Sequence, residues 1–472
     1  MTTQKSPQDN APVAVILAAG LGTRMKSATP KVLHPLLGEP MISYVTRALE
    51  QAGVGRMMAV LGHGAAQVEE ALRGRQDAAS PVIESVYQEQ QLGTGHALLM
   101  ALPRLRAWRE SGCDVCLVVY GDMPLLTGET LARLLQSRAD AGAAGAVLTA
   151  MPDDPAGYGR IIREDGRVVA IVEEKDADEG QRRIGEINAG AYAFDIDLLA
   201  EALQHLSPAN AQGEYYLTDV VAWLAARGHT VVAFPVSDTT EALGINDRLQ
   251  LSVAQDLLRR RILERHMLDG VTVEEPSATI IGPLVEIGRD TVIETGCQLF
   301  GRTTIGEACT IGPRSRITDC RIGGGARVNQ TTATECVIGD DCDVGPYTYL
   351  RPGCVLEKAV KAGTFVEMKK AIAAAGAKIP HLSYMGDCSV GKKANIGAGT
   401  ITCNYDGVDK HQTVIGDGAF IGSNSNLVAP VTVGEGAYTA AGSTITKEVP
   451  PWSLGVARGR QTNIVDWRKR RQ

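Results

Sequence analysis

A glycine-rich segment follows the first strongly apolar run of the sequence. It covers Leu17–Met25 and is followed by Pro30-Lys31. Its alanines and glycines let backbone N–H groups approach a phosphate or the edge of a base, and Arg24 and Lys31 supply positive charge for a polyphosphate. Neither the dinucleotide motif G-x-G-x-x-G nor the P-loop motif G-x-x-x-x-G-K-S/T fits this segment. Alone, it is a weak indication of phosphate binding.

A second candidate is an acidic residue at the end of another apolar run. Asp122 stands in Tyr120-Gly-Asp-Met-Pro124, directly after the run that begins at Val115. A carboxylate in this position could bind Mg²⁺, which prefers oxygen ligands. A single Asp after a strand more often begins a turn or caps a helix, so this assignment needs support from other motifs.

These residues require a scaffold in which the ends of several strands meet. Between Val13 and about Val236, short apolar runs alternate with amphipathic stretches, which predicts a doubly wound α/β domain with buried parallel strands. Ligands bind such sheets at the carboxyl ends of the strands, where the glycine-rich segment and Asp122 fall. The expected strands lie in VAVILAAG, MMAVLGHG, CDVCLVVYGD and AAGAVLTAM, and the expected helices cover Pro40–Ala52, Ala65–Arg73 and Thr130–Ala139.

The period of the sequence changes after a long helix predicted between Glu241 and Leu268. From there, aliphatic residues recur at every sixth position, and glycine directly follows four of them. A six-residue period predicts a parallel β-helix, in which the aliphatic residue fills a narrow interior and small residues form the corners. A β-sandwich with coincidental glycines is the weaker alternative. The unbroken register comprises Ile281, Ile287, Ile293, Leu299, Ile305, Ile311 and Ile317.

Two interruptions of this register are predicted to be surface loops, which often carry function in repeat proteins. The larger runs from about Lys358 to Asp387 and contains several lysines and His381. The smaller, Thr402–Gln412, contains the sequence Cys-Asn-Tyr-Asp. Histidine titrates near neutral pH and therefore suits a general base. The two loops are candidates for a second site.

Composition limits the classes of function. The 472 residues include 52 glycines but only 5 phenylalanines, and 47 Lys and Arg against 54 Asp and Glu give a net charge of -7. This charge argues against broad attraction to nucleic acid or to an anionic membrane. No apolar stretch reaches the ~20 residues that cross a bilayer, and the polar start of the chain has no signal-peptide core, so we expect a cytoplasmic protein. The ten cysteines are dispersed, which favours reduced and buried side chains.

The motifs of the first half, taken together, resemble those of sugar-phosphate nucleotidylyltransferases. Those of the second half resemble an acetyltransferase, and the pair resembles the family of bacterial bifunctional enzymes with N-acetylglucosamine-1-phosphate uridylyltransferase and glucosamine-1-phosphate acetyltransferase activities. The resemblance extends from about Ala14 to Arg458. Besides the segments already named, it rests on Gln91–Ala97, Gly157–Arg160, Val172-Glu173, Glu186–Gly190, Gly244–Asn246, Leu350–Gly353, Phe365–Lys370, His381–Asp387, Asn395–Gly407 and Leu427–Val431.

For the first half, the resemblance implies uridylyl transfer from UTP to N-acetylglucosamine-1-phosphate with release of pyrophosphate. Arg24 would neutralise the triphosphate, and Asp122 and Asn246 would bind Mg²⁺. The residues implied to bind UTP or the sugar nucleotide are Leu17, Ala18, Ala19, Gly20, Lys31, Gln88, Gly93, Thr94, Tyr120, Gly121, Asp122, Gly159, Glu173, Asn188 and Asn246.

For the second half, the resemblance implies acetyl transfer from acetyl-CoA to glucosamine-1-phosphate on a left-handed parallel β-helix, and assembly as a homotrimer. His381 would be the catalytic proton acceptor. The residues implied to bind the amino sugar phosphate are Arg351, Lys369, Tyr384 and Asn395, and those implied to contact acetyl-CoA are Ala398, Asn404, Tyr405, Ser423, Ala441 and Arg458.

The expected organisation has four parts. Residues 1–12 form a disordered leader, 13–240 the uridylyltransferase domain, 241–270 a linker with the long helix, and 271–472 the acetyltransferase β-helix with a C-terminal tail. Two alternatives are a nucleotidylyltransferase with a single activity, whose β-helix serves assembly or regulation, and a non-catalytic subunit of similar architecture. Arg24, Lys31 and Asp122 would be lost in the latter, and all three are present.

Overall fold

The structure is a computed structural model that describes residues 11–74 and 81–471. The chain divides into two compact units after Leu258. The expected leader falls outside the described residues except for Ala11 and Pro12. Pro12 is held in place, because its carbonyl oxygen accepts a hydrogen bond of 3.0 Å from the N–H of Gly55.

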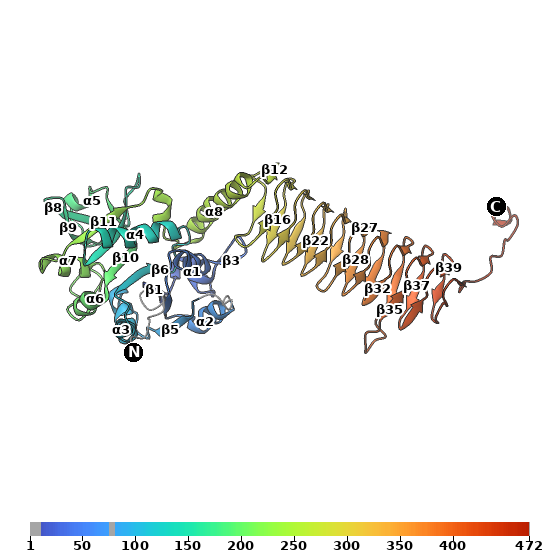
Figure 1. The fold of residues 1–472 in the computed structure, drawn as a ribbon, viewed down its shortest axis with the longest axis horizontal. Coiled ribbons are helices and arrows are strands. Elements are labelled where there is room, and N and C mark those ends of the chain that lie inside the picture. Colours follow the sequence, from blue (N-terminus) through green and yellow to red (C-terminus); the bar gives the residue numbers. More distant parts are fainter. Residues whose placement is uncertain (1–10, 75–80, 472) are drawn as a thin grey trace, which may run out of the picture. The chain divides into compact units, whose positions relative to one another are not determined.

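Unit 1 is built on a twisted sheet with helices on both faces (Figure 1). Its main strands are ordered β11-β7-β10-β6-β1-β4-β5, and the hairpin β8-β9 is attached through β10. The strands are β1 (Val13–Ala18), β4 (Arg56–Leu61), β5 (Ile83–Tyr87), β6 (Val115–Tyr120), β7 (Gly145–Ala150), β8 (Arg160–Glu164), β9 (Arg167–Val172), β10 (Ile187–Asp195) and β11 (Val231–Pro235), with a separate pair β2 (Pro35–Leu36) and β3 (Glu39–Pro40).

The helices of unit 1 form two layers because the strands alternate their side chains between the two faces. Val13 and Val15 of β1 join a core with α3, α6 and α7, whereas Ala14 and Ile16 join a core with α1, α2 and α4. The helices are α1 (Met41–Gln51), α2 (Ala65–Arg73), α3 (Thr94–Glu110), α4 (Gly128–Asp140), α5 (Glu179–Arg182), α6 (Ile196–Leu203) and α7 (Asp219–Ala226), with 3-10 turns at Thr23–Met25, Lys31–Leu33 and Thr239–Ala242.

The doubly wound α/β fold predicted from the apolar runs is confirmed, with one correction. The four predicted strands correspond to β1, β4, β6 and β7, but β10 lies antiparallel between β6 and β7, so the sheet is not wholly parallel. The register of β10 shifts between Asn188 and Tyr192, where Gly190 has a φ of 76°. The sequence Glu186–Gly190 was recognised as a motif, but the strand β10 was not predicted, because Gly190 interrupts its apolar pattern.

The long helix α8 covers Arg248–Leu268, so its predicted start near Glu241 was too early. The carboxylate of Asp247 accepts a hydrogen bond of 2.8 Å from the N–H of Gln250, which is the contact of an N-capping residue. The preceding segment instead contains a 3-10 turn and a loop that places Asn246. The division between the two units falls within this helix.

Unit 2 is a parallel β-helix whose short strands stack into three sheets (Figure 1). The first face contains β12 (Thr272–Val273), β15 (Val292–Ile293), β18 (Thr310–Ile311), β21 (Arg327–Val328), β24 (Asp343–Val344), β27 (Lys361–Thr364), β30 (Lys378–His381), β33 (Asn395–Ile396), β36 (Phe420–Ile421), β39 (Tyr438–Thr439) and β41 (Leu454–Gly455). The second contains β13 (Ile280–Ile281), β16 (Gln298–Phe300), β19 (Arg316–Thr318), β22 (Thr332–Thr334), β25 (Tyr349–Leu350), β28 (Glu367–Lys369), β31 (Tyr384–Gly386), β34 (Ile401–Cys403), β37 (Asn426–Val428) and β40 (Thr444–Ile445). The third contains β14 (Glu286–Ile287), β17 (Thr304–Ile305), β20 (Arg321–Ile322), β23 (Val337–Ile338), β26 (Val355–Leu356), β29 (Ile372–Ala373), β32 (Cys388–Val390), β35 (Thr413–Ile415) and β38 (Val431–Val433).

The residues at every sixth position occupy the interior, as predicted. Ile281 pairs with Leu299, and Leu299 with Ile317, one coil further on. Six of the seven residues in the first register are buried, and Ile287 is half-buried. The glycines that follow allow adjacent coils to approach closely. A Cβ on Gly306, for example, would lie 2.6 Å from the backbone nitrogen of Gly324.

Cysteine contributes small buried side chains to this interior. Seven cysteines stand two positions before an interior aliphatic residue, and each is buried and free. This confirms the prediction of reduced cysteines and gives them a packing role at the corners of the coils. The seven are Cys297, Cys309, Cys320, Cys336, Cys342, Cys354 and Cys388.

The prediction of the larger of the two loops was wrong. Residues 358–387 contain the regular strands β27 to β31, and the interior register continues through them. It was missed because Ala362, Met368 and Ala373, all fully buried, replace the branched residues that reveal the period. The smaller loop is present, since β34 ends at Cys403 and β35 begins at Thr413.

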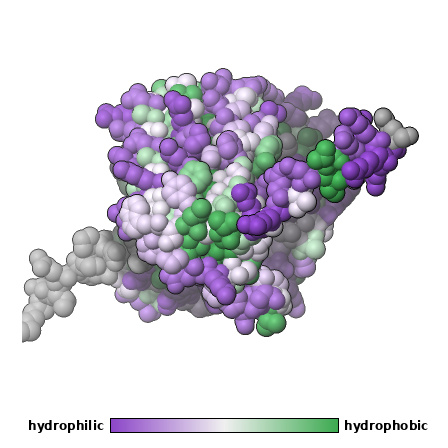
Figure 2. All heavy atoms as spheres, turned by 90° about the vertical axis from the view of Figure 1, so that its right-hand side faces the viewer, coloured by the Kyte–Doolittle hydropathy of each residue, from purple (hydrophilic) through white to green (hydrophobic). Residues whose placement is uncertain are grey.

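The chain ends in an exposed tail after β41. The surface seen from the side of the C-terminus is mainly polar, with apolar groups among the polar ones (Figure 2). Exposed apolar side chains of the tail include Ile464, Val465 and Trp467. Within residues 11–74 and 81–471, none of the helices combines the length and the hydropathy of a membrane span.

Two candidate active sites

A cavity of about 390 Å³ opens at the carboxyl ends of the central strands of unit 1. Polar and charged side chains in its wall come from segments far apart in the sequence, and the backbone of the glycine-rich segment forms one side. Among the predicted nucleotide-binding residues, Leu17, Ala18, Ala19, Gly20, Lys31, Gln88, Gly93, Thr94, Tyr120 and Asp122 line it. Leu21, Pro30, Val32, His63, Gln91, Ala97 and Glu214 complete the lining.

The glycine-rich segment keeps its position through contacts with the following motif. Gln91 Nε2 donates a hydrogen bond of 2.7 Å to the carbonyl oxygen of Ala19, and Gln88 Nε2 donates one of 3.0 Å to that of Gly93. Gly93 has a φ of 106°, and a Cβ there would lie 2.6 Å from the carbonyl oxygen of Tyr215. Both the conformation and the space therefore require glycine. Gln91 was not among the predicted site residues, although it belongs to the motif that indicated Gly93 and Thr94.

Lys31, Asp122, Asn246 and Arg24 form one charged cluster. The Lys31 ammonium contacts the Asp122 carboxylate and lies 3.1 Å from Asn246 Oδ1, which also accepts a hydrogen bond of 2.9 Å from Arg24 Nη2. Asp122 follows β6, and its carbonyl oxygen accepts a 3.0 Å hydrogen bond from the N–H of Ile245, next to Asn246. Within the described residues, no group of three or more His, Cys, Asp or Glu side chains could hold a metal ion.

The cluster nevertheless fits a magnesium ion that takes its remaining ligands from phosphates and water. Asp122 and Asn246 direct one carboxylate oxygen and one amide oxygen toward the same cationic group, the Lys31 ammonium. Hard oxygen donors of this kind suit Mg²⁺, which usually keeps several non-protein ligands in nucleotide enzymes.

The remaining predicted residues of unit 1 lie around Tyr120. Gly190 packs so closely on the Tyr120 ring that a Cβ would lie 2.7 Å from it, and the Gly190 N–H donates a 3.1 Å hydrogen bond to Asn188 Oδ1. The Asn188 N–H in turn bonds the carbonyl oxygen of Gly159 at 2.8 Å. Burial raises the pKa of the Tyr120 hydroxyl, which stays protonated.

Glu173 and Gly121 complete this group. A Cβ on Gly159 would lie 3.5 Å from Glu173 Oε2, and the Thr218 hydroxyl donates a 3.1 Å hydrogen bond to Glu173 Oε1. Burial raises the pKa of the Glu173 carboxyl. The N–H of Gly121 bonds the carbonyl oxygen of Leu17 at 2.9 Å. Arg24, Gly121, Gly159, Glu173, Asn188 and Asn246 do not line the 390 Å³ cavity and instead surround it through these contacts.

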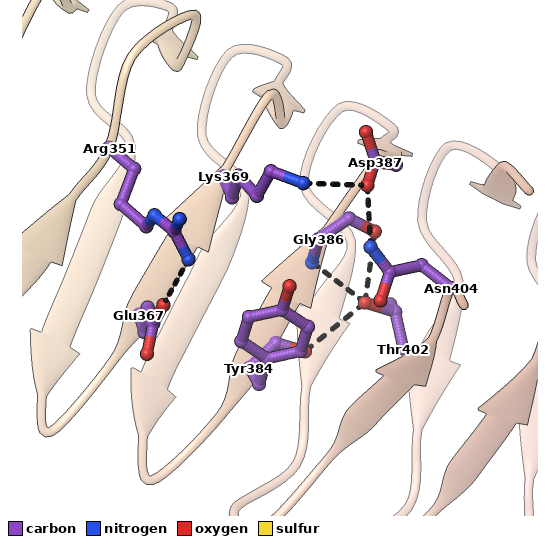
Figure 3. A network of polar contacts seen from close by, with 8 residues as sticks. All are labelled: Arg351, Glu367, Lys369, Tyr384, Gly386, Asp387, Thr402 and Asn404. Atoms are coloured by element: carbon purple, nitrogen blue, oxygen red, sulfur yellow. Dashed lines mark hydrogen bonds and ion pairs between the residues drawn. The ribbon is translucent and has the colours of Figure 1, made fainter. Parts of the chain in front are cut away.

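The second cluster of predicted residues lies on the second face of the β-helix (Figure 3). Glu367 and Tyr384 are neighbours in register, and so are Lys369 and Gly386, on the adjacent strands β28 and β31. Arg351 follows β25 one coil earlier, and its Nη1 lies 3.1 Å from Glu367 Oε1. The parallel coils thus align three predicted sugar-phosphate residues, Arg351, Lys369 and Tyr384, along one face.

Two acidic partners of these residues were not predicted. Glu367 pairs with Arg351, and Asp387 Oδ2 lies 3.6 Å from Lys369 Nζ while accepting a hydrogen bond from Asn404 Nδ2. Both stand within segments that carried the resemblance, but their role as partners depends on the stacking of coils. Asn404 is buried, whereas Tyr405 is 59% exposed, and its hydroxyl donates a hydrogen bond of 2.6 Å to the carbonyl oxygen of Gly407.

His381 and Asn395 lie on the first face rather than on the second. His381 ends β30 and pairs with Thr364, and Asn395 of β33 pairs with Lys378. His381 is exposed and is followed by the corner that leads to Tyr384 of β31, and its carbonyl oxygen accepts a 2.8 Å hydrogen bond from the Ser383 hydroxyl. The predicted base therefore lies at the corner next to Tyr384. Arg351 and Lys369 lie at the other end of the second-face strands, and Asn395 begins a first-face strand, so the structure does not gather all the predicted residues at one edge.

Three of the predicted acetyl-CoA residues continue the corner of His381 in later coils, whereas Asn404 and Tyr405 follow the second-face strand β34 at another corner. The N–H of Asn424 bonds the carbonyl oxygen of Ala398 at 2.7 Å, and the N–H of Gly442 bonds that of Ser423 at 2.8 Å, so Ala398, Ser423 and Ala441 stand at corresponding corners. Arg458 Nη1 donates a 3.0 Å hydrogen bond to the carbonyl oxygen of Ala441. Small residues thus stand at three successive corners along this edge.

Comparisons with known proteins agree with the two architectures. The model of the MobA-like NTP transferase domain matches residues 14–191, and that of the bacterial transferase hexapeptide, with six repeats, matches residues 412–447. Both parts of the predicted fold class are confirmed, namely a Rossmann-like α/β domain followed by a left-handed parallel β-helix. A solved UDP-glucose pyrophosphorylase complexed with UDP-glucose is similar with a TM-score of 0.43 and 20% identity, over 53% of this chain and 99% of that chain.

Curated relatives match nearly the whole chain. A protein of Heliobacterium modesticaldum named "Bifunctional protein GlmU" is 52% identical over 448 residues, which are 95% of each chain. Proteins of the same name from Geobacillus sp. (strain WCH70) and Desulfitobacterium hafniense (strain DSM 10664 / DCB-2) are 50% and 48% identical, and cover 95% and 96% of this chain and 96% and 98% of their own. The family resemblance found in the motifs of both halves is thereby confirmed, and the chain belongs to the family of the bifunctional protein GlmU.

Proposed function

We propose that the protein makes UDP-N-acetylglucosamine in two steps. Unit 2 transfers the acetyl group of acetyl-CoA to glucosamine-1-phosphate, and unit 1 then transfers the uridylyl group of UTP to N-acetylglucosamine-1-phosphate. The observation that carries this proposal is that each unit gathers its own cluster of motif residues, Lys31, Asp122 and Asn246 in one, and Lys369, Tyr384 and Asn404 in the other. A β-helix that served only assembly would not need the second cluster.

In unit 1, the sugar phosphate oxygen attacks the α-phosphorus of UTP, and pyrophosphate leaves. The backbone at Leu17–Gly20 and the side chain of Gln88 bind the nucleotide, with Gly93 and Thr94. Arg24 and Lys31 stabilise the charge that develops on the phosphoryl oxygens, and the sugar nucleotide lies against Tyr120, Gly159, Glu173 and Asn188. Mg²⁺, held by Asp122 and Asn246 when bound, supplies further charge stabilisation and orients the triphosphate.

In unit 2, the amine of glucosamine-1-phosphate attacks the thioester carbonyl of acetyl-CoA, and the thiolate of CoA leaves. His381 accepts the proton from the amine. Arg351 and Lys369 bind the phosphate dianion, and Tyr384 and Asn395 bind the sugar. Asn404, Tyr405 and the corners at Ala398, Ser423 and Ala441 contact acetyl-CoA, with Arg458 near its phosphates.

We further propose a homotrimer located in the cytoplasm. Hexapeptide repeats support oligomerisation in general, and the specific state is an expectation from the family. The partners proposed are the small-molecule substrates, without nucleic acid or membrane. The charge of -7 and the finding that no described helix could span a bilayer support the absence of those two partners.

Two substitutions test the assignment of one reaction to each unit. His381→Ala should abolish the release of free CoA with glucosamine-1-phosphate while UTP-dependent pyrophosphate release continues, and Asp122→Ala should do the reverse. Circular dichroism confirms that each variant is folded. A wild-type protein with uridylyl transfer and no acetyl transfer would support the single-activity alternative, and loss of both activities in both folded variants would refute the two-site proposal.

A further inference from the structure

The carboxylate of Asp387 joins two groups that belong to different proposed subsites. Its Oδ2 accepts a hydrogen bond from the Asn404 amide and lies 3.6 Å from the Lys369 ammonium (Figure 3). The side chains of Lys369 and Asp387 are only 15% and 19% exposed. A single oxygen therefore contacts one residue proposed to bind the amino sugar phosphate and one proposed to bind acetyl-CoA.

The backbone fixes the position of Asp387 independently of these side chains. Its N–H bonds the carbonyl oxygen of Lys369 at 2.9 Å, and its carbonyl oxygen accepts a 3.2 Å hydrogen bond from the N–H of Thr413. Asp387 has a φ of 46°, a conformation that Asp and Asn tolerate better than most residues. The two backbone hydrogen bonds thus tie Asp387 to the coil before it and to the coil after it, and they fix the position from which its carboxylate extends.

The preceding glycine creates the space for this arrangement. A Cβ on Gly386 would lie 2.5 Å from the Tyr384 hydroxyl and 2.8 Å from Asn404 Nδ2. The N–H of Gly386 bonds the Thr402 hydroxyl oxygen at 2.7 Å. Because Gly386 has no side chain, the Tyr384 ring and the Asn404 amide can both lie beside Asp387.

Lys369 also has a positively charged neighbour, Lys410, and the negative charge of Asp387 acts on both. Lys410, in the loop after β34, lies close enough to Lys369 for that ammonium to lower the pKa of Lys410. The Asp387 carboxylate opposes this repulsion, since it favours the charged form of both lysines. The carboxylate therefore partly offsets the repulsion between the two neighbouring ammonium groups.

We propose that Asp387 is a positioning residue for acetyl transfer, which holds Lys369 and Asn404 in place through one carboxylate oxygen and thereby links the sugar-phosphate and acetyl-CoA subsites. This inference rests on the proposed function of unit 2. In this role Asp387 does not contact the reacting atoms. Its loss should therefore affect the binding of both substrates, whereas loss of Lys369 or Asn404 alone removes a direct contact with one.

Asp387→Asn is the sharpest substitution, because asparagine keeps the shape and tolerates the positive φ but removes the charge. The matched control is Asp341→Asn. Asp341 is also a corner residue with positive φ, 57°, and its Oδ2 lies 3.3 Å from Lys358 Nζ. It stands at a different corner, between the third-face strand β23 and the first-face strand β24. Uridylyl transfer and the thermal unfolding midpoint monitor the fold of both variants.

Steady-state kinetics of acetyl transfer should show that Asp387→Asn raises the KM for glucosamine-1-phosphate and for acetyl-CoA by about tenfold each. The kcat should change less than about threefold, and Asp341→Asn should match the wild type. A purely structural role would lower kcat through loss of folded enzyme and leave both KM values unchanged. Unchanged KM values, a rise for only one substrate, or an equal effect of Asp341→Asn would overturn the proposal.

Calorimetry with coenzyme A alone provides a second measurement that does not depend on an Asp387 variant. Lys369→Met should weaken coenzyme A binding about threefold through the link, although Lys369 itself is assigned to the other substrate. Equal affinity in wild type and Lys369→Met would overturn the link. Absence of acetyl transfer in the wild type would instead refute the proposed function, which keeps the two failures distinguishable.

Discussion

The Lys31 ammonium forms an ion pair with the Asp122 carboxylate across 91 positions of the sequence. Asn246 Oδ1 faces the same ammonium at 3.1 Å, so a lysine side chain occupies the place at which two candidate metal ligands converge. Lys31 and a divalent cation would therefore compete for the same oxygens, unless phosphate binding draws Lys31 away.

Lys31→Met should separate these two roles. Removal of the ammonium frees the Asp122 carboxylate, so Mn²⁺ used as a probe, monitored by electron paramagnetic resonance without nucleotide, should bind more tightly than in the wild type. Uridylyl transfer should nevertheless fall by about 100-fold, because a charged contact with the phosphates is lost. Lys26→Met, at an exposed position, is the control and should change neither quantity. Weaker Mn²⁺ binding in Lys31→Met would contradict the competition.

Two adjacent glycines test the close stacking of coils. A Cβ on Gly323 would lie 2.6 Å from the backbone nitrogen of Asp340, whereas on Gly324 its nearest contact would be an ordinary 3.5 Å. Gly323→Ala should lower the free energy of unfolding by about 2 kcal/mol, since the next coil must shift. Gly324→Ala should change it by less than about 0.5 kcal/mol. Urea denaturation measures both, and equal effects would show that coil spacing is not the constraint.

Replacing the buried Glu173 carboxylate should raise the stability of the protein and weaken the binding of the sugar nucleotide. Burial raises its pKa, so the folded state binds a proton more strongly than the unfolded state. The cost of burying the charge is therefore present above the folded pKa and disappears as the pH falls below it. Glu173→Gln, which retains an acceptor for Thr218, should be more stable than the wild type at pH 8 and similar to it at pH 4. It should also lose affinity for the sugar nucleotide. Urea midpoints at the two pH values check the first part, and the opposite pH trend would refute it.

His266 should destabilise the protein in acid. Burial, with the neighbouring Arg265 charge, lowers its pKa from 6.5 to about 4. Because the unfolded histidine takes up a proton first, folding stability falls as the pH drops from 6.5 toward 4, by about 3 kcal/mol. His266→Gln should remove this part of the pH dependence, measured as the difference from wild type in urea midpoints between pH 7 and pH 4. The same substitution at the exposed His205 should leave the dependence intact.

Much of the fold could be predicted because its signals are local. The apolar runs that became β1, β4, β6 and β7 are short and are bounded by turn residues. The six-residue period survives in any single coil, since the interior admits only certain side chains. Prediction failed where the local signal was ambiguous. Ala362 and Met368 fill the interior but are not the branched aliphatic residues that mark the six-residue period. Gly190 interrupts the apolar pattern of an antiparallel strand, so the strand was not predicted.

The sequence by itself determined the two architectures, the family and the residue types of both candidate sites, because these depend on local periodicity and on motifs of adjacent residues. Only the tertiary structure decided which charges meet. Lys31 reaches Asp122 because the segment after β1 and the residues after β6 meet at the same edge of the sheet. Asp387 reaches Lys369 and Asn404 because parallel coils place residues about 17 positions apart side by side. Such contacts arise from packing between distant segments, which no local pattern specifies.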